Sequence, residues 1–269
     1  MLYAPPHSTS LPRAALRLLA GWWGVLHFGA VALVLALSPS SHTRAQRSTT
    51  ALLLYRTTWQ VLPWFAALCA LVSLVMVRIV LVTAQSYGLS QFALEMVVRV
   101  LVLELIPLSA ALFVVLRSGL ATGNEIAAMR QRGDLDSWQH GDIAPWRAHL
   151  VPRVIASAFS VVTLAAVSCV VALVLAYTAV YGFTPWGFAA YTRMVGRVFE
   201  PSVALGFGVK LMLFSLAVAV IPMASALQQP RTPRPAPADD STVAVPFGTV
   251  RLLVVLVLIE AGSLAIRYF

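Results

Sequence analysis

Six long apolar segments alternate with short polar connections along the chain. They cover about 16–37, 61–83, 97–116, 154–181, 203–227 and 250–269. A helix that crosses a bilayer needs about 20 predominantly apolar residues, so each segment is long enough to span one. No long soluble domain and no internal repeat interrupts them. The pattern therefore predicts an all-α membrane protein.

Composition supports this prediction. Of the 269 residues, 59% are hydrophobic and 11% are charged, against roughly 25% charged in soluble domains. The mean hydropathy is +0.84. These values exclude a soluble enzyme, a disordered protein and a nucleic-acid-binding domain. Cys69 and Cys169 both lie inside apolar segments, where we expect them to be core residues rather than disulfide partners or metal ligands.

Arginine accounts for most of the net charge of +9, since Lys210 is the only lysine. Three connections, 38–58, 117–153 and 228–251, hold most of these arginines. Their members are Arg44, Arg47, Arg56, Arg117, Arg130, Arg132, Arg147, Arg153, Arg231, Arg234 and Arg251. Connections rich in arginine stay in the cytoplasm, so we expect all three on that side.

The N-terminal segment decides the topology. If it crossed the membrane, Arg13 and Arg17 would lie outside, against the positive-inside rule. A helix lying in the cytoplasmic interface removes this conflict, and Trp22 and Trp23 suit that position. We therefore predict an interfacial helix followed by five spans, with the N-terminus in the cytoplasm and the C-terminus outside. A signal peptide is the alternative.

Two charges inside the predicted spans are candidates for function. Glu104 and Lys210 each lie about seven residues into a span that runs inward, or ~10 Å below the outer surface at about 1.5 Å per residue. A charge at the centre of a membrane helix costs about 2.5–3.5 kcal/mol on insertion scales. We expect the two to face each other or a polar cavity. A purely structural ion pair is the alternative to a cavity.

Arg78 is a third charge inside a span, about five residues from the outer end of the first one. Its long side chain is able to reach the outer headgroups. The alternative is an ion pair with Glu104.

The stretch between Leu103 and Arg153 carries a group of short motifs. Their residues are Glu104, Pro107, Arg117, Gly119, Glu125, Ile126, Met129, Pro145, Pro152 and Arg153. In type and spacing they resemble the R-E-L-G-P, G-R-[AS]-G, A-E-I-G-x-M, D-P and P-R motifs of the MlaE/YrbE family of permeases. Gln85 and Lys210 also match family positions. The chain departs from the motifs at Leu103, Ile106 and Leu116, and a proline-rich stretch over 228–240 replaces a glycine-rich one.

The resemblance implies the permease subunit of an ATP-driven ABC transporter that moves phospholipid between the bacterial inner membrane and a periplasmic MCE-type carrier. Residues 1–58 would form the cytoplasmic N-terminus and interfacial helix, and 59–269 the five-helix permease domain. Glu104, Lys210 and Arg78 would border a lipid cavity open to the periplasm. The implied partners are an ABC ATPase, a periplasmic MCE lipid-binding protein, a second permease chain and a small STAS-type regulatory subunit.

The cytoplasmic region 117–153 would couple the permease to its ATPase. Within it, Gly133–Trp138 has the pattern of a short helix capped by Asp134. Leu135 and Trp138 would be its apolar contacts, with Asp136 between them; an ordinary solvated loop is the alternative. Arg117, Gly119 and Glu125 are expected to order the end of the second span, since Arg117 and Glu125 share a helix face and glycine permits close helix approach.

Catalysis is not expected in this chain. It has no G-x-x-x-x-G-K-[ST] motif for ATP, so we expect no cofactor here, with ATP and magnesium bound by the partner ATPase. Its five histidines form no close pair suited to a metal. Two other functional classes remain open: a secondary transporter or channel that needs no ATPase, and a structural permease subunit paired with a different permease chain.

Overall fold

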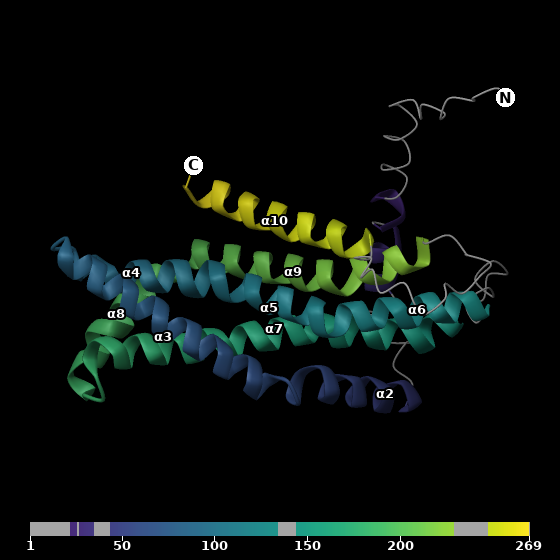
Figure 1. The fold of residues 1–269 in the computed structure, drawn as a ribbon, viewed down its shortest axis with the longest axis horizontal. Coiled ribbons are helices and arrows are strands. Elements are labelled where there is room, and N and C mark those ends of the chain that lie inside the picture. Colours follow the sequence, from purple (N-terminus) through teal and green to yellow (C-terminus); the bar gives the residue numbers. More distant parts are fainter. Residues whose placement is uncertain (1–21, 26, 35–43, 134–143, 229–246, 269) are drawn as a thin grey trace, which may run out of the picture.

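The computed structural model describes residues 22–25, 27–34, 44–133, 144–228 and 247–268. Every regular element in these ranges is helical. Five helical stretches are long and apolar enough to cross a membrane: Thr50–Ser86, Phe92–Ile126, His149–Tyr181, Pro201–Gln228 and Gly248–Ile266. They run side by side as an elongated bundle (Figure 1). The predicted all-α fold with five spans is confirmed.

The first span is built from α2 (Arg44–Leu54), the π-helix η2 (Tyr55–Trp59) and α3 (Leu62–Ser86). Residue 58, where sequence analysis placed the domain boundary, lies within η2. The π-helical turn is tied to α7 by hydroxyl groups, since Thr58 Oγ1 lies 2.7 Å from Ser160 Oγ. Such hydroxyl contacts hold membrane helices together where the surrounding lipid offers no polar partner.

The second span is a continuous helical stretch from Ser90 to Arg132. It comprises α4 (Ser90–Val97), η3 (Val98–Leu105), α5 (Ile106–Val114), η4 (Val115–Gly119) and α6 (Leu120–Arg132), where η3 and η4 are π-helical. It is much longer than the apolar segment 97–116, because the polar residues of α6 continue the helix. It ends at Gly133, whose φ of 84° favours glycine.

The remaining helices are α7 (Ala144–Tyr181), the 3-10 turn η6 (Pro185–Gly187), α8 (Phe188–Val198), α9 (Pro201–Gln228) and α10 (Phe247–Tyr268). Sequence analysis missed α8, which is short and has one buried face formed by Tyr191, Met194 and Val198. In Figure 1, α4 and α8 lie at one end of the bundle and α2 and α6 at the other. We call these the α8 end and the α6 end.

The core lies between α7, α9 and the second span. Phe214, Ile126 and Leu164 are fully buried there, at 1% exposure or less. A second cluster near the α8 end joins α3, η3, α7 and α8 around Val77, Val98 and Leu103. α10 packs along α9 and keeps most of its apolar surface exposed. This is the distribution expected of a bundle surrounded by lipid.

A short apolar helix over Trp22–Val34 precedes the bundle. Val25, Phe28 and Ala32 are buried in the core, and a Cβ added at Gly29 would lie 3.2 Å from the side chain of Val220 in α9. The helix is shorter than the about 20 residues that a span requires. Figure 1 shows it running across the α6 end of the bundle rather than along it. Its place in the membrane interface stays a prediction.

Candidate functional site

Three charged side chains from three helices meet in the apolar bundle: Glu104 of η3, Lys210 of α9 and Glu260 of α10. Lys210 forms ion pairs with both carboxylates, and its Nζ lies 2.8 Å from Oε2 of Glu260. The side chains of Lys210, Glu104 and Glu260 are 2%, 11% and 16% exposed. We call these three residues the charge cluster. Sequence analysis expected Glu104 and Lys210 to face each other, and the structure joins them in an ion pair.

The backbone of the second span supplies a further acceptor for Lys210. Pro107 has no amide hydrogen, so it cannot donate to the carbonyl of Leu103 four residues earlier, as an α-helix requires. Lys210 Nζ donates a hydrogen bond of 3.2 Å to this carbonyl. The ammonium group therefore faces three oxygens, from Glu104, Glu260 and Leu103. Because an ammonium group has three N–H donors, this protein environment is sufficient for all of them.

The charge cluster lies deeper in the helices than the sequence predicted. Glu104 follows Phe92 by twelve residues, and Lys210 follows Pro201 by nine. At about 1.5 Å per residue both are roughly 14–18 Å from the start of their helices, rather than ~10 Å. The difference arises because both helices begin before their apolar segments do. The two candidate spans are 35 and 28 residues long, so Glu104 and Lys210 each lie about a third of the way along their helix.

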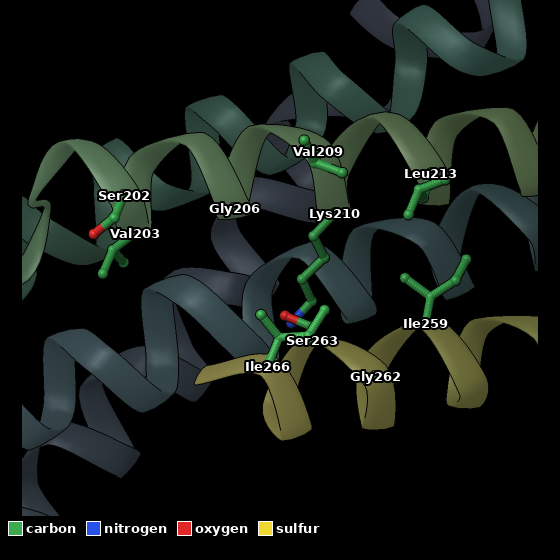
Figure 2. Close-up of a pocket in the computed structure, with 10 residues that line it drawn as sticks. All are labelled: Ser202, Val203, Gly206, Val209, Lys210, Leu213, Ile259, Gly262, Ser263 and Ile266. Carbon is green, nitrogen blue, oxygen red and sulfur yellow. The ribbon is translucent and has the colours of Figure 1, made fainter. Parts of the chain in front are cut away.

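An apolar groove of about 530 Å³ between α9 and α10 borders the charge cluster. Lys210 forms part of its wall, and the hydroxyls of Ser202 and Ser263 are its other polar groups (Figure 2). Gly206 and Gly262 leave open space where side chains would stand. The remaining lining residues are Val203, Val209, Leu213, Ile259 and Ile266. Ligand sites commonly have this size and this mixture of apolar walls with few polar groups.

Arg78 does not pair with Glu104 in this structure. Its side chain is exposed on α3, whereas the carboxylate of Glu104 is paired with Lys210. Arg78 is also absent from the lining of the groove between α9 and α10. The structure thus places Arg78 on the outer surface of the bundle, where a long cationic side chain is free to extend along the helix toward lipid headgroups.

A second ion pair joins the second span to α7 near the α6 end. Arg153 Nη2 of α7 lies 2.7 Å from Oε2 of Glu125, whose side chain is 60% exposed. Arg153 also contacts Sδ of Met129 at 3.7 Å. Sequence analysis placed Glu125 on a shared face with Arg117, but the partner that the structure gives it comes from another helix. Arg117 is exposed in η4.

Gly119 and Gly123 lie against α9 at Pro222. A Cβ added at Gly119 would stand 3.6 Å from Cγ of Pro222, and one added at Gly123 would stand 3.8 Å from its carbonyl oxygen. These are ordinary contact distances, so alanine fits at both positions. The proposed coupling residues Asp134, Leu135, Asp136 and Trp138 lie outside the described residues.

Sequence analysis did not single out Glu260. The signal was present, because Glu260 is the only acidic residue in the last apolar segment and an ionisable residue within a span marks a functional candidate. The same argument that singled out Glu104 and Lys210 therefore applies to it. What the sequence does not show is that α9 and α10 pack together, which brings Glu260 to Lys210.

Comparison with known proteins gives one finding on the family. A family model described as Permease MlaE matches residues 51–261, which include the five spans almost completely and all three members of the charge cluster. A search of curated proteins found no match to the chain.

Proposed function

The chain belongs to the MlaE permease family, and we propose that it moves phospholipid as the membrane subunit of an ATP-driven transporter. Membership makes it a membrane permease subunit of an ABC-type transporter, a transport protein rather than a catalytic one. The proposal adds the cargo, the energy source and the route, which runs through the groove between α9 and α10.

The observation that carries the proposal is a charge cluster within the spans, beside an apolar groove. Charges at this depth are costly and mark substrate pathways in membrane proteins. A phospholipid has a polar headgroup and apolar chains, so it matches a groove whose walls are mostly apolar and include Lys210 and two serines. A purely structural ion pair would need no adjoining groove.

The proposed assembly follows from the family and from where the arginines lie. Family permeases generally work with ATPase partners; here a separate ATPase would bind ATP and magnesium. The periplasmic partner would be an MCE-type lipid carrier, and a second permease chain and a STAS-type regulatory subunit would complete the complex. Arg132 ends α6, and Arg153 and Arg251 lie within ten residues of the starts of α7 and α10, which supports a cytoplasmic position for the α6 end. The inner membrane is then the location, with the C-terminus in the periplasm.

Reconstitution tests the proposal. The full chain is placed in vesicles with and without its ATPase, and movement of a fluorescent phospholipid is followed with and without ATP. We expect transport only with both the ATPase and ATP, and we expect Lys210→Met to abolish it while Arg193→Met, an exposed cation on α8, leaves it intact. Transport without the ATPase would identify a secondary transporter or channel. Absence of transport in every arm would contradict the proposal and favour a structural permease subunit.

A further inference from the structure

Pro107 deprives two neighbouring carbonyls of the second span of the amide donor that the helix pattern would give them. In an α-helix the carbonyl of Leu103 accepts from the amide of residue 107, and proline has none. The carbonyl of Val102 lies in the π-helical η3, where the partner is the amide five residues later, again residue 107. The amide of Ile106 donates to the carbonyl of Leu101 instead. One proline therefore frees two adjacent acceptors.

Side chains of two other helices donate to these carbonyls. Lys210 Nζ of α9 donates to the carbonyl of Leu103 at 3.2 Å, and Cys169 Sγ of α7 donates to the carbonyl of Val102 at 3.6 Å. Val102 and Leu103 are at most 1% exposed, so water does not replace these donors. Because a buried carbonyl without a partner costs about as much as a lost hydrogen bond, the two side chains supply what Pro107 removes.

The carbonyl of Leu103 differs from the other oxygens around Lys210 in being fixed by the backbone. The carboxylates of Glu104 and Glu260 stand at the ends of side chains with several rotatable bonds, and so does the ammonium group itself. A hydrogen bond to a rigid acceptor restricts where Nζ is able to stand. The backbone oxygen therefore determines the position of the ammonium group in the wall of the groove.

From these contacts we infer that Pro107 is a positioning residue, which fixes the ammonium group of Lys210 by leaving the carbonyl of Leu103 free to accept its hydrogen bond. The contact between Cys169 and Val102 is a second attachment, weaker because a thiol is a poor donor. The inference deepens the proposed function and rests on it in one respect, since Lys210 lines the proposed lipid route.

A double-mutant cycle between Pro107→Ala and Lys210→Met tests the inference. Pro107→Ala restores an amide at residue 107. With Lys210 in place, this amide competes with the ammonium group for the carbonyl of Leu103; in the Lys210→Met protein, it supplies the donor that the carbonyl has lost. We therefore expect Pro107→Ala to shift the thermal unfolding temperature of the Lys210→Met protein upward by roughly 5 °C relative to its effect on the wild type.

Equal shifts in the two backgrounds would overturn the inference, because a proline that only shapes its helix acts in the same way with or without Lys210. Pro222→Ala is the matched control. Pro222 lies inside α9, twelve residues after Lys210, or ~18 Å along the helix. Its effect should be the same with and without Lys210→Met.

A second comparison keeps the test decisive if the Lys210→Met protein does not fold. Glu104→Gln and Glu260→Gln are added to Lys210→Met, so that no charge of the cluster remains buried without a counter-charge. The same difference between the two effects of Pro107→Ala is expected, and equal shifts would again overturn the inference. The measurement is stability rather than transport, so a failure of this inference and a failure of the proposed function give different results.

Discussion

The second span carries two acidic residues that pair with cations from other helices, and their settings differ. Glu104 lies in the middle of the bundle beside Lys210, with both side chains at most 11% exposed. Glu125 lies near the α6 end beside Arg153, and its side chain is 60% exposed. Both pairs join a carboxylate to a cationic side chain. Because water screens only the second pair, we expect burial to decide how much each pair contributes to stability.

Removal of the shared cation should have the largest effect. Lys210→Met leaves Glu104 and Glu260 buried together without a counter-charge, and loss of one partner from a buried ion pair costs about 3–5 kcal/mol. We expect a large drop in the thermal unfolding temperature of the purified protein in detergent. Lys210→Arg, which keeps the charge, should lose less. A Lys210→Met protein as stable as the wild type would show that the cluster is not coupled as described.

Loss of one carboxylate should have a smaller effect than loss of the cation. Glu104→Gln removes one ion pair but leaves Lys210 with Glu260 and the Leu103 carbonyl, so we expect destabilisation of about 2 kcal/mol, as for a hydrogen bond to a charged group. Combining Glu104→Gln with Lys210→Met tests the coupling. The combined loss should be clearly less than the sum of the two single losses. Strict additivity would argue against the ion pair.

The exposed pair should respond weakly. Glu125→Gln is expected to cost about 0.5 kcal/mol, in the range of exposed ion pairs, and high salt should abolish the difference from the wild type. The measurement is thermal unfolding at low and high ionic strength. A loss as large as that of Glu104→Gln would remove the distinction between the two sites.

The smallest effect concerns Arg78. Because Arg78 is exposed on α3 and Glu104 is paired with Lys210, Arg78→Gln and Glu104→Gln should destabilise independently, with coupling below about 0.5 kcal/mol. Exchange of the two charges in one variant should not rescue either single change. Rescue would instead support the ion pair between Arg78 and Glu104, which the sequence left open.

The sequence predicted the spans well and their ends poorly. Apolar length reports which residues lie in hydrocarbon, so the five spans were accessible from the pattern. The length of an apolar segment does not report where a helix ends in water. The sequence therefore did not predict that the helix continues through the polar residues of α6. Glu104 and Lys210 were found because isolated charges in apolar segments need partners. The partner of Glu125 was not found, because the approach of Arg153 in α7 to α6 is a property of the fold.

The central claim is that a lipid headgroup reaches the charge cluster through the groove between α9 and α10. Two neighbouring residues of α10 test it at the same depth, since Ile259 lines the groove whereas Leu258 is 62% exposed and absent from its lining. Ile259→Cys and Leu258→Cys proteins are incubated with a phospholipid that carries a thiol-reactive headgroup, and the wild type, whose Cys69 and Cys169 are buried, serves as background. The account predicts labelling at residue 259 and background at residue 258. Equal labelling of the two positions, or none at residue 259, would contradict it.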